Sequence, residues 1–219
     1  MVHIMTELLD LKYSIAGSYL KEFSGPWEAL DGIADLIRSL GKNLGEDYAE
    51  LSPQVWVHKT AVVAPSAYVG APCIIGPRTE VRHCAFIRGS ALIGGDCVVG
   101  NSTEIKNAIL FDHVEVPHFN YVGDSILGYH AHLGAGAVTS NVKSDRSDGV
   151  VQIGDVRIDT KRHKLGAILG DYAEVGCNSV LNPGTIVGRY SSIYPTCCVR
   201  GIVPSRSIYK ADGSIIRKV

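Results

Sequence analysis

A six-residue repeat dominates the chain. A β-branched aliphatic residue recurs nine times at this spacing between Val57 and Ile105. A helix needs apolar residues about every 3.6 positions and a strand every second position, so neither explains a period of six. A fixed short period is typical of a solenoid whose chain turns a corner at each repeat. Small residues precede the last eight aliphatic ones by two places: Ala61, Ala67, Cys73, Thr79, Ala85, Ala91, Cys97 and Thr103.

Both columns are predicted to point into the core of a mainly β prism. Each buried Val or Ile contributes roughly 1.5–3 kcal/mol, so the repeat can stabilise the fold. After Ile105 the register shifts by one residue twice, and such shifts are expected at corners, because within a strand they would invert its faces. The later members of the column are Leu110, Val116, Val122, Leu127, Leu133, Thr139, Leu169, Val175, Leu181, Val187, Ile193 and Val199. At three repeats per coil, residues 53–204 make about seven coils.

Three segments lie outside the repeat. Residues 1–52 show helical apolar spacing on both sides of Gly25-Pro26, which predicts two short helices that cap the open end of the solenoid. Residues 141–166, here called the arm, are dense in charge, and the Gly154-Asp155 pair between apolar runs predicts a hairpin. The arm is either a solvated loop or a contact to a neighbouring subunit or ligand. Residues 205–219 form a basic tail without a predicted structure.

Composition excludes several classes of partner. A net charge of −1 gives no general attraction to nucleic acid or to acidic membranes. No apolar run approaches the ~20 residues of a membrane span, and the first ten residues lack the features of a signal peptide. The six cysteines show no zinc-site spacing. We therefore expect a cytoplasmic protein with reduced thiols, no metal, and no nucleic-acid or membrane partner.

A few polar residues are not required by the repeat. Arg88 and Lys106 are eighteen positions apart and should stack on one edge of adjacent coils, where two cations favour a phosphate. His118 follows Val116 at a non-core position, and an imidazole is a natural base at neutral pH. The cluster Lys161-Arg162-His163-Lys164 is a second cationic group. For each of these residues a simple solvated surface role remains open.

Four motifs carry a resemblance to a known family. They are Arg88-Gly-Ser-Ala-Leu-Ile-Gly, Val99-Gly-Asn-Ser-Thr-Glu-Ile-Lys106-Asn, Pro117-His-Phe-Asn-Tyr-Val-Gly-Asp124 and Leu133-Gly-Ala-Gly-Ala-Val-Thr-Ser-Asn141. Residues 55–200 resemble the acetyltransferase domain of bifunctional glucosamine-1-phosphate acetyltransferase/N-acetylglucosamine-1-phosphate uridyltransferase. The helical segment before them is similar to that of short stand-alone sugar-nucleotidyltransferase-like proteins with hexapeptide repeats.

The resemblance implies a left-handed parallel β-helix and a homotrimer with active sites between subunits. It implies an acetyltransferase that uses acetyl-CoA on an amino-sugar phosphate or a nucleotide-linked sugar. His118 would be the general base that deprotonates the attacking amine, and backbone N–H groups would stabilise the oxyanion. The residues expected to contact the acceptor are Arg88, Lys106, Tyr121, His132, Asn141 and Lys164. Those expected along acetyl-CoA are Cys177, Pro195 and Arg200.

The chain also departs from the family. His132 replaces an asparagine that touches the sugar, Val142 replaces a tyrosine, and the arm is longer. The acceptor is therefore open. No glycine-rich phosphate loop follows a strand, so we expect no nucleotidyltransferase domain.

Two alternative functions remain. The first is a non-catalytic scaffold or sugar-nucleotide-binding protein. The second is a γ-type carbonic anhydrase, because His113 and His118 have a spacing similar to two zinc ligands of that family. Catalytic zinc needs a third protein ligand, and Pro77 stands where that ligand should be.

Overall fold

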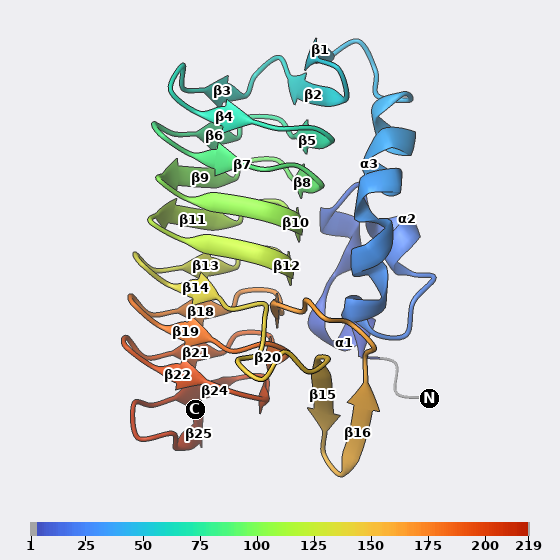
Figure 1. The fold of residues 1–219 in the computed structure, drawn as a ribbon. Coiled ribbons are helices and arrows are strands. Elements are labelled where there is room, and N and C mark those ends of the chain that lie inside the picture. Colours follow the sequence, from blue (N-terminus) through green and yellow to red (C-terminus); the bar gives the residue numbers. More distant parts are fainter. Residues whose placement is uncertain (1–3, 219) are drawn as a thin grey trace.

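The chain folds as a three-sided parallel β-helix with helices along one side (Figure 1). The structure is a computed structural model and describes residues 4–218. The coil is left-handed, as the resemblance implied. In each coil the chain passes over face 1, face 2 and face 3 in that order.

Each face is a stack of short parallel strands. Face 1 consists of β3 (Val62–Val63), β6 (Glu80–Val81), β9 (Val98–Asn101), β11 (Glu115–His118), β13 (His132–Leu133), β18 (Glu174–Val175), β21 (Ser192–Ile193) and β24 (Ser207–Tyr209). Face 2 consists of β4 (Tyr68–Val69), β7 (Phe86–Ile87), β10 (Glu104–Leu110), β12 (Tyr121–Leu127), β14 (Val138–Thr139), β19 (Val180–Leu181) and β22 (Cys198–Val199). Face 3 consists of β2 (Val55–His58), β5 (Cys73–Ile75), β8 (Ala91–Ile93), the second halves of β10 and β12, β17 (Ala167–Leu169), β20 (Thr185–Val187) and β23 (Ile202–Val203).

The solenoid is longer than the predicted seven coils. Face 1 has eight parallel strands, and the last of them, β24, lies in the basic tail, for which no structure was predicted. Strand β25 (Ile215–Arg217) then returns antiparallel to β24. This tail was missed because its hairpin has no hexad spacing. The hairpin covers the edge that the final coil would otherwise leave unpaired.

Corners explain both the period and its shifts. Residues at corners adopt positive φ every six positions, as in Arg78, Cys84, Ser90, Asp96 and Ser102. The next corners between faces 2 and 3 come after only five residues, at Asn107 and Asp124. There β10 and β12 continue through the corner as seven-residue strands. The predicted shifts therefore do fall at corners, and those two corners carry the polar site described below.

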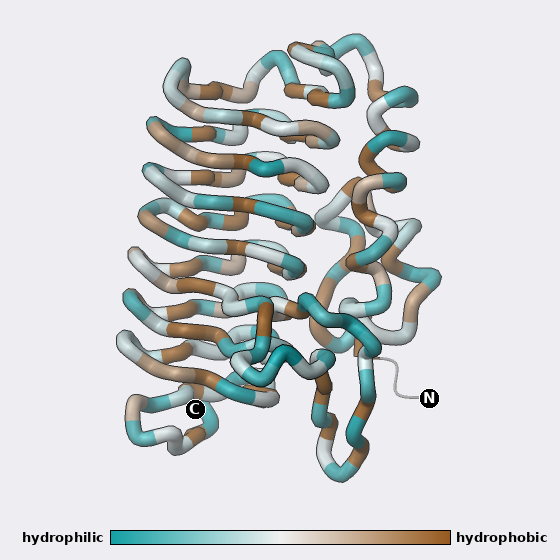
Figure 2. Tube along the Cα trace, viewed as in Figure 1, coloured by the Kyte–Doolittle hydropathy of each residue, from teal (hydrophilic) through white to brown (hydrophobic). Residues whose placement is uncertain are grey.

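The core is formed by the predicted columns. Inward aliphatic residues such as Ile87, Val99 and Leu133 have no exposed surface. The small partners fit beside them, and the buried hydroxyl of Thr79 donates to the Gly94 carbonyl. Figure 2 shows the hydrophobic positions recurring at the same place in successive coils.

The N-terminal segment lies along face 3 and not over the open end, which corrects the prediction of a helical end cap. Face 3 differs from the other two faces because its outward apolar residues are buried, namely Ile74, Leu92, Ile109, Ile126, Ile168 and Ile186. Helix α3 (Ile33–Gly41) contacts β5, β8 and β10 and covers part of this surface. The preceding turns are α1 (Met5–Leu8), η1 (Leu11–Tyr13), α2 (Gly17–Leu20) and η2 (Pro26–Gly32). The open end is covered instead by β1 (Tyr48–Ser52), antiparallel to β2.

The arm contains the predicted hairpin. Strands β15 (Val150–Ile153) and β16 (Val156–Asp159) pair antiparallel around Gly154, whose φ is +55°. In Figure 1 the hairpin extends below the N-terminal helices, away from the coils of the first half. None of the helices in residues 4–218 is long and apolar enough to span a membrane.

Candidate active site

Face 2 presents a column of exposed side chains between two chemically different edges. Tyr68, Phe86, Glu104, Tyr121 and Val138 follow one another in register on adjacent coils. Unlike the outward residues of face 3, these are half-exposed or exposed. Face 2 can therefore serve as the floor of a binding site.

Arg88 and Lys106 lie on the edge between faces 2 and 3. Ile87 pairs with Ile105, so the two cations that follow occupy neighbouring coils, as the spacing predicted. Each already has an acidic partner. Arg88 Nη1 is 2.7 Å from Glu104 Oε1, and Lys106 Nζ is 3.8 Å from Asp124 Oδ2. An anion at this edge would compete with these carboxylates.

Asp124 organises the polar groups of this edge. Its carboxylate is buried and accepts hydrogen bonds from Asn107 Nδ2 at 2.9 Å and Asn141 Nδ2 at 2.6 Å. Asn141 Nδ2 also donates to the Tyr121 hydroxyl at 3.1 Å. Burial and the nearby Asp124 carboxylate raise the pKa of Tyr121, so its hydroxyl stays protonated and available as a donor. Three residues predicted from the resemblance, Lys106, Tyr121 and Asn141, thus meet around Asp124, which was not singled out although it closes one of the motifs.

The base of the arm borders the same corner. The Leu165 amide donates to the Asn141 carbonyl and the Gly166 amide to the Asp124 carbonyl. The predicted residue Lys164 lies just before this junction and lines a cleft of about 290 Å³. The cleft is lined by Asp31, Asn107, Asp124, Lys161, Arg162, His163 and Lys164.

His118 lies on the opposite edge of face 2, between faces 1 and 2. Its side chain is exposed, and within residues 4–218 its ring makes no hydrogen bond or ion pair. The buried Asn120 side chain fixes the backbone by accepting from the His118 amide at 3.1 Å and donating to two carbonyl groups on the next coil.

Cys177 and Pro195 lie on the same edge as His118. The Gly136 amide donates to the His118 carbonyl, the Asn178 amide to the Ala135 carbonyl, and the Thr196 amide to the Cys177 carbonyl. These bonds stack successive coils along one line. The residues predicted for the base and for two acetyl-CoA contacts therefore share an edge.

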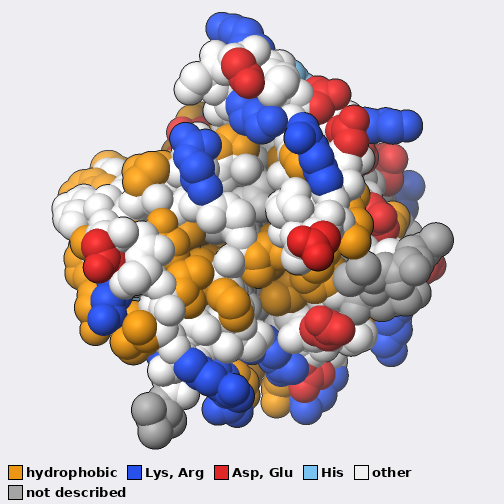
Figure 3. All heavy atoms as spheres, turned by 90° about the horizontal axis from the view of Figure 1, so that it is seen from below, with side chains coloured by type: hydrophobic (Ala, Val, Ile, Leu, Met, Phe, Trp, Pro, Cys, Tyr) orange, Lys and Arg blue, Asp and Glu red, His pale blue; other side chains and the backbone are white. Residues whose placement is uncertain are grey.

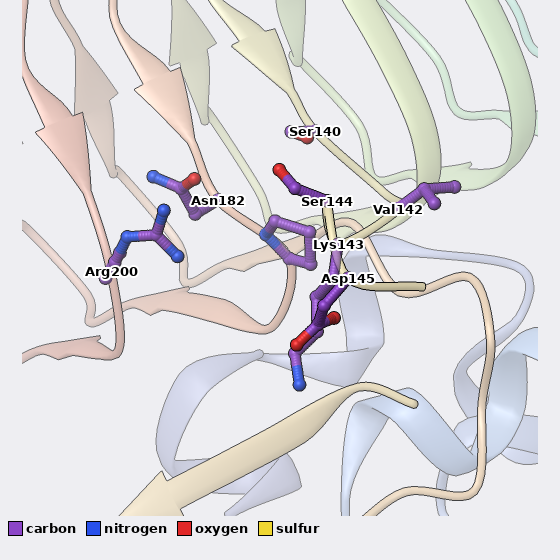
Figure 4. A pocket seen from close by; sticks show the side chains of 8 residues that line it. Ser140, Val142, Lys143, Ser144, Asp145, Asn182 and Arg200 are labelled. Carbon is purple, nitrogen blue, oxygen red and sulfur yellow. The ribbon is translucent and has the colours of Figure 1, made fainter. Parts of the chain in front are cut away.

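Arg200 lies elsewhere, on the edge between faces 2 and 3. It borders a cleft of about 260 Å³ with Ser140, Asn182 and the first residues of the arm (Figure 4). Figure 4 shows the Arg200 and Asn182 side chains on one wall and Lys143 and Asp145 of the arm opposite. Arg200 is thus separated by face 2 from Cys177 and Pro195, with which it was grouped.

His132 is on face 1 and is paired with Glu174. Its Nδ1 is 2.8 Å from Glu174 Oε2, and the two residues are in register on adjacent coils. The hydrogen bond to Glu174 raises the pKa of His132. Glu174 was not predicted, because the inserted arm puts the pair 42 positions apart in the sequence.

The described residues contain no group of three or more His, Cys, Asp or Glu side chains placed to hold a metal ion. His113 instead stacks on His130, with ring centroids 4.5 Å apart, and lies 3.7 Å from Asp96. The two histidines considered as zinc ligands, His113 and His118, thus have different surroundings. His118 thus lies on one edge of face 2, and Arg88 and Lys106 lie on the other.

Comparison with known families agrees with the resemblance seen in the sequence. A family model described as the GMPPB C-terminal domain matches residues 72–216. A bifunctional sugar-1-phosphate nucleotidylyltransferase/acetyltransferase from Sulfurisphaera tokodaii is 28% identical over 198 residues, which are 88% of this chain and 49% of that protein. The bifunctional protein GlmU from Methanococcus maripaludis is 35% identical over 114 residues, 52% of this chain and 28% of that protein. The chain thus spans about half the length, or less, of these relatives.

Two solved structures that match part of this chain are PerB and the acetyltransferase domain of PglB. PerB from Caulobacter crescentus, in complex with CoA and GDP-perosamine, is 17% identical with a TM-score of 0.41, and the match covers 84% of this chain and 67% of PerB. The acetyltransferase domain of PglB from Neisseria gonorrhoeae, in complex with acetyl coenzyme A, is 16% identical with a TM-score of 0.38, covering 83% and 65% of the two chains.

Proposed function

The chain belongs to the family of the GMPPB C-terminal domain, and from this premise we propose that it is an acetyltransferase using acetyl-CoA. Its acceptor would be an amino-sugar phosphate or a nucleotide-linked sugar. The observation that carries the proposal is the pair of unlike edges on face 2, with His118 on one and Lys106 on the other. The relative named as a bifunctional sugar-1-phosphate nucleotidylyltransferase/acetyltransferase supports the same reaction.

The acceptor would lie across face 2. Its phosphate would bind at the edge of Arg88 and Lys106, where guanidinium and ammonium groups suit phosphate oxygens. Its sugar ring would lie over Tyr121, whose hydroxyl is held by Asn141 at 3.1 Å. This orientation directs the amine toward the edge of His118.

The acetyl donor would lie along the edge that stacks His118, Cys177 and Pro195. His118 would accept a proton from the amine as its nitrogen attacks the thioester carbonyl. The new C–N bond forms, the C–S bond breaks, and the thiolate of coenzyme A leaves. The exposed ring of His118 is free to accept that proton, since no group in residues 4–218 occupies it.

The active unit would be a homotrimer. Faces 1 and 2 are not covered by the N-terminal segment, and face 2 exposes Tyr68 and Phe86, whose rings contact each other edge to face with centroids 5.5 Å apart. A second chain against these residues would exclude water from the acceptor and supply additional contacts. The cytoplasm would provide both substrates.

A binding protein without transfer activity is the second candidate. It is favoured by one observation, the lack of any partner that orients the His118 ring within the described chain. Catalytic histidines are commonly held in one tautomer by a hydrogen bond to the second ring nitrogen.

Release of free thiol from acetyl-CoA separates the two candidates. The purified protein would be incubated with acetyl-CoA and, in turn, glucosamine-1-phosphate, a UDP-linked amino sugar and unphosphorylated glucosamine. An acetyltransferase of the proposed kind releases thiol with a phosphorylated amino sugar and little with glucosamine. Tight binding of the phosphorylated sugars without any thiol release would instead indicate the binding protein.

A further inference from the structure

Arg162, in the cationic cluster at the base of the arm, is not used by the reaction proposed above, and its guanidinium is buried with free hydrogen-bonding capacity. Only 10% of the Arg162 side chain is exposed. Its Nη1 forms an ion pair with Asp31 Oδ2 at 2.5 Å, without hydrogen-bond geometry, and its Nε has no hydrogen-bond partner. A buried charged donor left unsatisfied is costly, so this arrangement indicates a site for an acceptor group.

The surroundings of Arg162 favour an anion. Lys161 and Lys164 line the same cleft, and neither ammonium group forms an ion pair within residues 4–218. Of the two carboxylates in the lining, Asp124 already accepts from Asn107 and Asn141, and the Asp31 side chain is 84% exposed. The cleft thus has more cationic than available acidic groups, and phosphate oxygens match the planar donor fork of arginine.

The cleft adjoins the edge proposed for the first phosphate. Asn107 lines the cleft and follows Lys106 directly, and both side chains contact Asp124. We infer that Arg162, with Lys161 and Lys164, binds a second phosphoryl group, so that the site takes ligands that carry a diphosphate. This inference rests on the proposed function for the placement of the first phosphate at Lys106.

Asp31 occupies the position of that second phosphate in the free protein. It comes from η2, in the N-terminal segment, whereas Arg162 comes from the arm. A diphosphate would displace this exposed carboxylate and supply the acceptor that Arg162 Nε lacks. Two sources of the diphosphate are possible, a nucleotide-linked sugar and coenzyme A.

The test is isothermal titration calorimetry with UDP, UMP, inorganic pyrophosphate and coenzyme A at fixed ionic strength. The wild-type protein should bind UDP at least tenfold more tightly than UMP, and Arg162→Gln should remove most of this difference. Asp31→Asn should tighten pyrophosphate binding two- to fivefold, because it frees Arg162. Arg157→Gln is the matched control, since Arg157 lies in the exposed strand β16 of the same arm.

If Arg162→Gln loses affinity for UDP alone, the diphosphate that Arg162 binds belongs to the nucleotide-linked sugar. If it loses affinity for coenzyme A alone, the diphosphate belongs to coenzyme A. Unchanged affinity for every probe, or an equal loss in Arg157→Gln, would overturn the inference. Asp31→Asn is expected to tighten pyrophosphate binding, whereas a folding defect would weaken it. This variant therefore separates the proposed effect from a loss of folding. Arg162-dependent binding of UDP without any thiol release would leave the inference standing and remove the proposed acetyl transfer.

Discussion

Asp124 is the residue on which the polar edge of the site depends. It joins Lys106, Asn107 and Asn141, and it sits at a corner with φ of +49°. Asn also tolerates this backbone conformation, so Asp124→Asn keeps the corner and changes only the hydrogen bonding. The side-chain amide that replaces the carboxylate has one oxygen, so it can accept from Asn107 or from Asn141 but not from both in the present geometry. The substitution also removes the carboxylate that pairs with Lys106.

Asp124→Asn should therefore lower the free energy of unfolding by about 2 kcal/mol, a usual cost for a buried donor left without an acceptor. Urea unfolding followed by circular dichroism measures this loss. Asp145→Asn, on the exposed part of the arm, should change the free energy by less than about 0.5 kcal/mol. Equal stability of both variants would show that Asp124 does not hold the corner.

The pair of His132 and Glu174 predicts a specific dependence on pH. Because Glu174 raises the pKa of His132 in the folded state, the pair stabilises the protein below the pKa of the unfolded histidine. This contribution is lost as the pH rises through the raised pKa of the folded state. The difference in Tm between the wild type and Glu174→Gln should thus be larger at about pH 6 than at about pH 9.

Proton NMR of the imidazole ring gives the direct readout. The titration of His132 should move to lower pH in Glu174→Gln, with His58 on the first coil as an internal reference. If the His132 ring titrates at the same pH in Glu174→Gln as in the wild type, the assigned hydrogen bond is wrong.

The stacking of the coils explains which site residues could be predicted from the sequence. Arg88 and Lys106 are eighteen residues apart, so the period alone places them on adjacent coils. Asn107 and Asp124 are only 17 apart, and His132 and Glu174 are 42 apart. These pairs depend on the shortened corners and on the inserted arm, whose geometry the period does not contain. Arg162 and Asp31 meet through tertiary packing of two segments outside the repeat.

At the scale of elements, the sequence predicted helices, coils and hairpin but not where the helices pack. The residues that mark the face covered by the helices can be seen in the sequence. Ile74, Leu92 and Ile109 each directly precede an inward aliphatic residue, on every third repeat. Paired apolar residues indicate a strand covered on both sides. On faces 1 and 2 the outward apolar residues, such as Val62 and Phe86, are exposed, and only face 3 is covered by α3.

Ile37→Ala tests this packing. Ile37 is fully buried in α3, so its truncation should destabilise the protein by about 2–5 kcal/mol through lost burial and a cavity. Ser39→Ala on the exposed side of the same helix should change stability by less than about 0.5 kcal/mol. Chemical denaturation compares the two. A small effect of Ile37→Ala would mean that α3 does not contact the solenoid in solution.

At the scale of the molecule, the two uncovered faces predict self-association. Figure 3 shows a different apolar area at the C-terminal end of the solenoid, surrounded by charged side chains. A groove of about 400 Å³ there is lined by Ile4, Leu8, Ile153, Ile186, Ile202 and Val203, among others. This groove lies far along the axis from Tyr68 and Phe86. It is therefore separate from the contacts proposed for the trimer, which involve the first coils of face 2.

Light scattering after size exclusion should give a mass three times the 23.5 kDa of one chain. Phe86→Asp should shift the protein toward 23.5 kDa, because a carboxylate would be buried in the contact. Ile15→Asp, at an exposed site in the N-terminal segment, should keep the mass of the wild type. A monomeric wild type at micromolar concentration would remove the proposed site between chains.

The central claim is that the exposed imidazole on one edge of face 2 takes the proton of the attacking amine. The most direct measurement is kcat for thiol release from acetyl-CoA by His118→Ala, with His58→Ala as the control. We predict a fall of about 100-fold or more for His118→Ala, the usual share of a general base, with an unchanged Tm because the ring has no partner in residues 4–218. Activity equal to that of His58→Ala would contradict the account.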